Sequence, residues 1–84
     1  MAQPLLRVVI SSSEQVIFDG TASSVLLPGE RGTFEVLPLH RPLVSRLLAG
    51  PVIVDGRRVQ IQRGVAQIAD DIVTAAVELS KDSR

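Results

Sequence analysis

The sequence has no cysteine, tryptophan or tyrosine, and its only aromatic residues are Phe18 and Phe34. Without cysteine, neither a disulfide framework nor a thiolate metal site can form, and the redox compartment stays undecided. Two phenylalanines in mainly apolar segments offer no row of rings on which nucleic-acid bases could stack. Cysteine-based sites and recognition of nucleic acid by stacking are therefore excluded.

An excess of charge of either sign is also lacking, because nine basic residues balance nine acidic ones. A protein that binds nucleic acid by general charge neutralisation needs a clear excess of positive charge. We interpret the small basic cluster of Arg57, Arg58 and Arg63 as a solvated strand face. The composition therefore predicts no nucleic-acid partner.

Long apolar runs are missing as well, since no segment approaches the roughly 20 residues that span a bilayer. The first residues, M-A-Q-P-L-L-R, have no basic region followed by a long apolar stretch. We therefore expect neither a membrane-spanning segment nor a signal peptide.

Histidine is scarce too, with His40 as the single one. A metal site needs three or four ligands, which one histidine and scattered carboxylates do not supply. No nucleophile motif surrounds any serine, so a catalytic triad is not indicated. The segment P-G-E-R-G lacks the Lys-Ser/Thr pair and the following helix of a phosphate-binding loop. We therefore predict no catalytic residue, no metal and no cofactor.

The chain is rich in valine, isoleucine, leucine and alanine, a composition that favours strands. Its length predicts one domain, 1–84, ordered from about 5 to 78 with a frayed polar tail. Alternating apolar residues predict strands at 5–11, 16–18, 21–27, 33–37, 52–54, 58–62, 65–69 and 72–77. Residues 43–48 fit either a helical turn or a strand. The pattern predicts an all-β sandwich or barrel of about ten short strands.

Turn signals separate these strands. Residues 11–13 and 70–71 are predicted as turns, and residues 19–20 and 55–56 carry the Asp-Gly dipeptide of hairpins. Pro28-Gly29 is predicted at the centre of a type II turn, because Pro fixes the first torsion and Gly tolerates a positive φ. Gly64, inside a strand pattern, predicts a bulge or a corner.

The segment from Val25 to Gly50 contains many conformationally restricted residues. The turn-forming residues predicted there are Pro28, Gly29, Gly32, Pro38, Pro42 and Gly50. Apolar residues recur between them, so we expect this segment to hold a surface in a fixed shape.

The same segment resembles the hallmark stretch of the epsilon subunit of F-type ATP synthases, which is called delta in mitochondria. That family typically reads Pro-Gly, a short spacer, Gly, an aromatic residue or Leu, then Pro-Gly-His-Ala-Pro-Leu-Leu and a later Gly. The positions in register are Pro28, Gly29, Gly32, Phe34, Val36, Pro38, His40, Pro42, Leu43, Leu47 and Gly50. Residues 18–20, 64–68 and 72–74 resemble further family motifs, so the resemblance runs from about residue 5 to 78.

The sequence departs from the family pattern at several positions. Leu39 and Glu35 stand where glycines are usual, and Arg63-Gly64-Val65 replaces a double glycine and an aromatic residue. Many members continue into a C-terminal helical hairpin, whereas this sequence ends at Arg84. The resemblance therefore implies a short form, in which inhibition of ATP hydrolysis and ATP sensing by the hairpin would be absent.

The resemblance implies a β-sandwich in the central stalk, the rotor, of ATP synthase. Such a subunit would bind the gamma subunit and the ring of c subunits, and it would couple ion-driven rotation to ATP synthesis. It would perform no chemistry and bind no nucleotide, because the nucleotide sites lie on other subunits. It would be peripheral to the membrane, at the cytoplasmic face of the bacterial inner membrane.

The resemblance also implies an interface with the c ring or with gamma. The residues implied are Glu30, Arg31, Thr33, Glu35, His40 and Arg41. Charged side chains there would fix register more than they would supply affinity. The alternative interpretation is an ordinary solvated edge, with His40 hydrogen-bonded to local backbone.

Two further hypotheses stay open. Apolar residues in excess of one small core could form a patch for a partner, and the candidates are Val9, Leu26, Leu39, Val44 and Leu48. The alternative function is a free-standing β-sandwich module that binds a carbohydrate or peptide, although such a site would need exposed aromatic residues. An enzyme is a more distant alternative, because no polar constellation converges.

Overall fold

The structure, a computed structural model, describes residues 5–80. The predictions for the first four residues and for the tail at 81–84 lie outside the described residues. Within the described range the chain forms eight strands and no helix. The strands are β1 Leu6–Ser11, β2 Val16–Ala22, β3 Val25–Gly29, β4 Gly32–Val36, β5 Leu43–Leu47, β6 Gly50–Val54, β7 Arg57–Ala69 and β8 Ile72–Leu79. The predicted all-β sandwich is confirmed, with eight strands in place of about ten.

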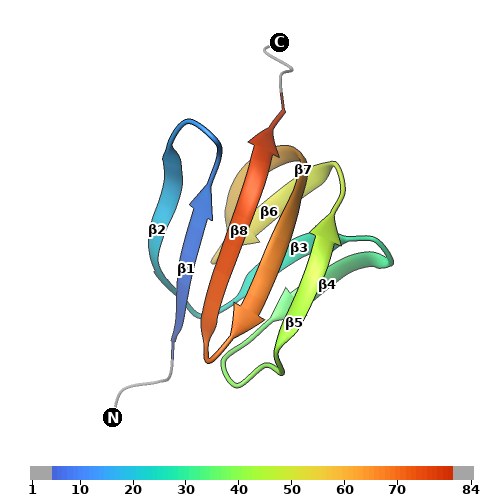
Figure 1. Cartoon of the computed structure of the whole chain (residues 1–84). Helices are drawn as coiled ribbons and strands as arrows, with labels where there is room; N and C mark the ends of the chain where they lie inside the picture. Colours follow the sequence, from blue (N-terminus) through green and yellow to red (C-terminus); the bar gives the residue numbers. More distant parts are fainter. Residues whose placement is uncertain (1–4, 81–84) are drawn as a thin grey trace.

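The strands form one sheet that folds over itself into two layers (Figure 1). One layer contains β2, β1, β8, the C-terminal half of β7 and β5, in that order. The other contains β3, β4, β6 and the N-terminal half of β7. β7 belongs to both layers because residues 57–61 pair with β6 and residues 64–68 pair with β5. β1 and β8 pair in parallel, and the other pairs are antiparallel.

Gly64 lies where β7 changes partners. The register between β7 and β8 shifts just before it, between Ile61 and Arg63. The predicted bulge or corner is therefore confirmed.

The core lies between the two layers and is apolar throughout the described residues. Strand β8 illustrates how apolar residues reach the core. Successive side chains of a strand point to opposite faces, so its inward residues Val73, Ala75 and Val77 alternate with exposed ones. The largest fully buried side chains are Leu6, Ile10, Leu27, Leu47, Ile61 and Ile68. Each contributes about 1.5–3 kcal/mol relative to an exposed position.

The hairpin turn predicted at Asp19-Gly20 is wrong. Both residues lie inside β2, where they pair with Val9 and Val8 of β1. Asp19 accepts a hydrogen bond from the Arg7 guanidinium at 2.7 Å, which favours the paired strand over a turn. Tertiary pairing thus overrides a local turn signal.

The type II turn predicted at Pro28-Gly29 is also wrong, because both residues belong to β3 and pair with Thr33 and Gly32. The turn comes two residues later, at residues 30–31. Gly29 lies under the ring of Phe34, so a Cβ there would be 2.8 Å from two ring carbons. Gly32, predicted as turn-forming, has a φ of +114°.

Strand pairing and a backbone hydrogen bond decide two further predictions, for residues 43–47 and for residues 78–80. Residues 43–47 form strand β5, so the helical alternative is wrong. β8 extends to Leu79, and the Ser80 amide donates to the Gln60 carbonyl oxygen at 3.3 Å. The fraying predicted from residue 78 onward is therefore wrong for residues 78–80.

The predicted turns at 55–56 and 70–71 are confirmed, with positive φ at both residues of each turn. Asp55 also accepts hydrogen bonds from the Ser23 and Ser24 amides, each at 3.0 Å. Its carboxylate therefore fixes the connection between β2 and β3 against the β6–β7 turn.

We expect Asp55→Gly to destabilise the fold by about 1–2 kcal/mol, because it removes these charge-assisted hydrogen bonds yet tolerates the positive φ. Asp70→Gly is the matched control, since Asp70 also has a positive φ, of 52°, but caps no such connection. Urea denaturation of both variants measures the difference. Equal stability of the two would contradict the capping role of Asp55.

Candidate functional site

The predicted interface residues Glu30, Arg31 and Thr33 lie together at the β3–β4 hairpin. They line a groove of ≈ 520 Å³ between this hairpin and residues 43–46 of β5. Glu30 Oε2 lies 3.7 Å from Arg46 Nη1, and both side chains are more than half exposed. An ion pair of that kind adds little to stability, so these charges are available for a partner.

Glu35, His40 and Arg41 are not part of this groove. Glu35 is exposed on β4, opposite Leu26. His40 and Arg41 lie in the β4–β5 connection, at the end of the sandwich where the β7–β8 turn also lies (Figure 1). The predicted interface is therefore divided between the β3–β4 hairpin and the β4–β5 connection. Strand β4 runs from one to the other.

The loop of residues 37–42, which we call the β4–β5 loop, begins with a tight turn. The His40 amide donates to the Leu37 carbonyl oxygen at 3.1 Å, and Leu39 has a φ of 71°. Pro at the second position and a positive φ at the third are the features of a type II turn. His40 Nδ1 lies 2.7 Å from the Arg41 carbonyl oxygen, so Nδ1 carries the proton and donates it. The hydrogen bond to local backbone considered for His40 is thus present.

Leu39 and Asp71 meet in this loop. The Leu39 amide donates to Asp71 Oδ1 at 2.6 Å, and the Leu39 side chain is 83% exposed. The sequence predicts Leu39 only as one member of an apolar patch and Asp71 only as a turn residue. One sequence feature marks Leu39 as unusual, because it stands where a glycine is usual in the family that the sequence resembles.

The outward face of the β1–β8–β7–β5 sheet carries side chains without charge at its centre. Register places Val9 opposite Thr74, Thr74 opposite Gln67, and Gln67 opposite Val44. The adjoining row pairs Ala76 with Val65. We call this surface the uncharged face, and it consists of Val9, Val44, Val65, Gln67, Ile72, Thr74 and Ala76. Val44 is 68% exposed and Val65 is 49% exposed, although both are apolar.

Ion pairs surround the uncharged face. Arg7 pairs with Asp19 at 2.7 Å on the β2 side. Arg63 pairs with Glu78 at 3.2 Å, across β7 and β8. The Glu30–Arg46 pair lies on the β5 side. A centre without charge inside a polar rim is the usual composition of a protein–protein interface.

The structure divides the residues of the predicted apolar patch between different parts of the surface. Val9 and Val44 belong to the uncharged face. Leu26 is half-buried in β3, Leu39 lies in the β4–β5 loop, and Leu48 follows β5. Leu39 and Leu48 lie outside the strands, and Leu26 lies on β3 in the other layer.

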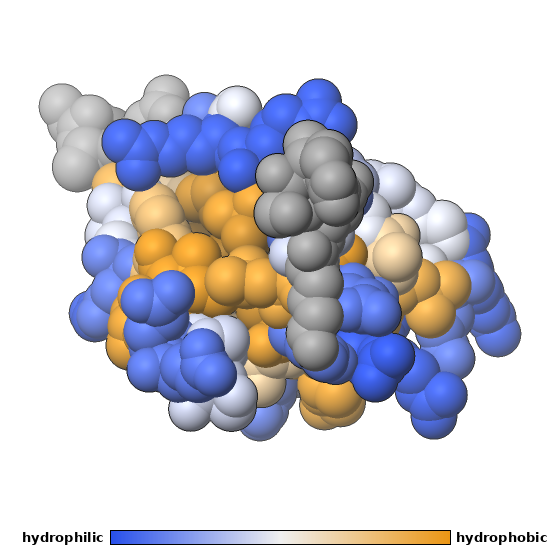
Figure 2. Space-filling view, turned by 90° about the horizontal axis from the view of Figure 1, so that it is seen from above, coloured by the Kyte–Doolittle hydropathy of each residue, from blue (hydrophilic) through white to orange (hydrophobic). Residues whose placement is uncertain are grey.

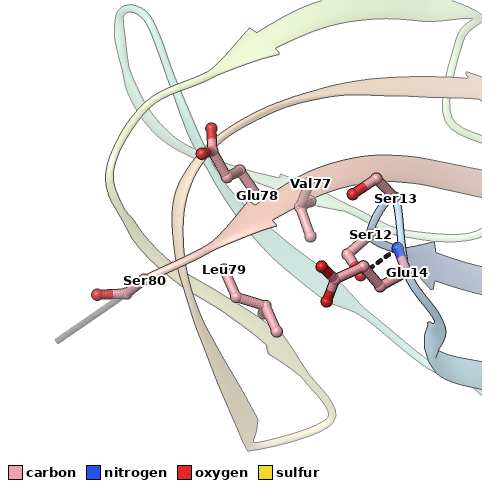
Figure 3. A pocket seen from close by; sticks show the side chains of 7 residues that line it. All are labelled: Ser12, Ser13, Glu14, Val77, Glu78, Leu79 and Ser80. Carbon is pink, nitrogen blue, oxygen red and sulfur yellow. Dashed lines mark hydrogen bonds between the residues drawn. The ribbon is translucent and has the colours of Figure 1, made fainter. Parts of the chain in front are cut away.

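The opposite end of the sandwich has an open hollow of ≈ 530 Å³, lined by residues 12–14 and 77–80. Seen toward this end, apolar residues gather between hydrophilic margins (Figure 2). The Glu14 amide donates to Ser12 Oγ at 3.2 Å, so the serine is used within its own turn (Figure 3). The polar side chains that line the hollow are serines and two glutamates, with no histidine, lysine or arginine among them.

The described residues, 5–80, offer neither a metal-binding cluster nor a membrane-spanning helix. No group of three or more histidine, aspartate or glutamate side chains there could hold a metal ion. No helix formed by residues 5–80 is long and apolar enough to cross a membrane.

The fold defines the chain as a small all-β sandwich domain. Comparison with known families then gives a specific result, because the model of the family described as "ATP synthase, Delta/Epsilon chain, beta-sandwich domain" matches residues 5–79. The chain belongs to this family.

Relatives and solved structures agree with this assignment. The ATP synthase epsilon chain of Bordetella avium is 34% identical over 88 residues, covering 90% of this chain and 62% of the relative. That of Xanthomonas campestris is 36% identical, covering 87% and 56%. This chain thus spans less than two thirds of the length of such relatives.

The fold recurs in chains of two mitochondrial ATP synthases. A chain in the central stalk and c-ring structure from Tetrahymena thermophila superposes with a TM-score of 0.73 at 10% identity, covering 93% of this chain and 66% of that one. A chain in the Euglena gracilis structure superposes with a TM-score of 0.78 at 20% identity, covering 92% and 53%. At these identities the likeness concerns the fold.

Proposed function

We propose that the chain is a non-catalytic central-stalk subunit of an F-type ATP synthase. Its family membership supports this, as do relatives named ATP synthase epsilon chain. In this role it binds the gamma subunit and the c ring and turns with both. It is peripheral to the membrane through the complex, at the cytoplasmic face of a bacterial plasma membrane.

The uncharged face is the observation that carries the proposal, and we assign the gamma subunit to it. Burying Val44, Val65 and Ile72 removes apolar surface from water without stranding a charge, which is favourable. The Arg7–Asp19 and Arg63–Glu78 ion pairs stay at the solvated rim of this interface, where they set orientation more than affinity.

The c ring is assigned to the β3–β4 hairpin and the β4–β5 loop, which carry Glu30, Arg31, Thr33, Glu35, His40 and Arg41. Strand β5 begins after this loop and contributes Val44 to the uncharged face, so one folded unit carries both surfaces. Rotation of the ring can then reach gamma through a continuous hydrogen-bonded sheet. Coupling of this kind needs no nucleotide or reactive group on this chain.

We expect the double charge reversal Glu30→Lys and Glu35→Lys to lower ATP-driven proton pumping severalfold while gamma binding and the fold persist. Both carboxylates are exposed, so the change in stability stays within about 0.5 kcal/mol. Glu14→Lys, in the β1–β2 connection and outside both proposed surfaces, is the control. Unchanged pumping by the double variant would contradict the assignment of Glu30 and Glu35 to the ring.

A pull-down from membranes distinguishes this function from a free-standing module that binds a carbohydrate or peptide. The tagged chain is expected to retrieve ATPase activity together with gamma and c subunits. Retrieval of a glycan or peptide without ATPase activity would favour the module instead.

A further inference from the structure

Leu39 combines two features that folding alone does not explain. Its side chain is 83% exposed, more than any other large apolar residue described. Its φ of 71° is strained for leucine, because in the left-handed region Cβ approaches the following carbonyl oxygen. Glycine would satisfy this turn without strain. Strained residues persist where the surrounding structure holds them, and they cluster at functional sites.

The surrounding structure does hold Leu39. Asp71 Oδ1 accepts the Leu39 amide hydrogen at 2.6 Å. Asp71 is itself fixed, since its carbonyl oxygen accepts the Arg7 amide hydrogen at 2.9 Å. Pro38 and Pro42 stiffen the loop on either side. An apolar side chain displayed on a stiff loop loses little conformational entropy when a partner covers it.

We propose that Leu39 is a specificity-determining contact with the c ring and that Asp71 is the positioning residue that holds it. The proposal rests on the function proposed above. It adds a contact residue, Leu39, at a position where the family usually has glycine. The β4–β5 loop belongs to the surface assigned to the ring, and Leu39 is the most exposed apolar residue in that loop. Burying the Leu39 side chain against the ring would offset the backbone strain that Leu39 has in the free protein.

The first arm of the test measures thermal stability. Leu39→Gly relieves about 1–2 kcal/mol of left-handed strain, which outweighs the roughly 0.5–1 kcal/mol that the extra conformational freedom of glycine costs. Its Tm is therefore expected to rise by about 2–8 °C. Leu48→Gly is the matched control, because Leu48 is a 45% exposed leucine at the other end of β5 without a positive φ. Its Tm is expected to fall, since glycine has more conformational freedom to lose. A fall in Tm for Leu39→Gly would contradict the strain argument.

The second arm measures affinity for gamma alone and for a purified gamma–c-ring assembly in detergent. Leu39→Gly is expected to bind gamma normally and to bind the assembly at least about tenfold more weakly. Leu48→Gly is expected to match the unmodified chain in both. Normal binding of the assembly by Leu39→Gly would overturn this inference and leave the proposed function standing. Failure of the unmodified chain to gain affinity from the ring would overturn both.

The third arm isolates Asp71. Asp71→Gly tolerates the φ of 62° but removes the acceptor, so ring affinity is expected to fall several-fold. Asp71→Asn keeps an oxygen acceptor and is expected to restore affinity. In the Leu39→Gly background, Asp71→Gly should have no further effect on ring binding, because the residue it positions is gone. A full additional loss in that background would show that Asp71 acts independently of Leu39.

Discussion

Gly64→Ala is expected to destabilise the fold by about 3 kcal/mol, because β8 leaves no room for a methyl group. A Cβ on Gly64 would lie 2.6 Å from the Ala76 carbonyl oxygen and 3.1 Å from the Val77 Cα. Both contacts are backbone atoms in a paired strand, so relief requires β7 and β8 to move apart. Overpacking of this kind typically costs about 1–3 kcal/mol, and a bent, paired strand lies at the upper end.

Thermal unfolding measures the effect, and a loss of about 3 kcal/mol corresponds to a fall in Tm of about 12–24 °C for a domain of this size. Gly20→Ala is the control, because Gly20 also lies within a strand and its Cβ would be 3.4 Å from the nearest Phe18 carbon. That variant is expected to change stability by less than about 1 kcal/mol. Similar Tm values for the two variants would contradict the steric role of Gly64.

Gln67→Glu is expected to weaken gamma binding about 100-fold, or about 2.7 kcal/mol. The substitution keeps the shape of the side chain and adds one negative charge in the middle of the uncharged face. Its cross-strand neighbours, Thr74 and Val44, offer no counter-charge. A carboxylate covered there by gamma would lose its water, and no cation of this chain lies directly opposite it.

Gln60→Glu is the matched control, since Gln60 is an exposed glutamine of the same strand that pairs with Pro51 of β6, away from the uncharged face. It makes the same chemical change and is expected to leave gamma affinity unchanged. Calorimetry or a biosensor measures the affinity of both variants for gamma. Equal affinities for gamma would remove the uncharged face from the interface.

Much of the fold follows from local patterns. Alternation in residues 72–77 predicts β8 because one face of that strand is buried. The turn at 55–56 is equally predictable, since Asp-Gly accepts positive φ at both positions. The same dipeptide at 19–20 misleads, because Arg7 and strand β1 pair with it. Residues 43–47 become a strand through their pairing with β7 and β3, which are distant in sequence.

The site is less predictable because it depends on contacts between distant segments. Val9 and Val44 share one face only because β8 and β7 lie between their strands in a particular register. The hydrogen bond from Leu39 to Asp71 joins residues 32 positions apart in sequence. Sequence patterns mark Glu30 and His40 as members of one segment, but the fold places them on separate parts of the surface.

Under the proposed function, this chain binds the gamma subunit as part of a rotor. Gel filtration of the purified chain mixed with purified gamma tests it most directly. We predict that the two proteins elute together as a stable one-to-one complex. Elution of the two as separate species at micromolar concentrations would contradict the account.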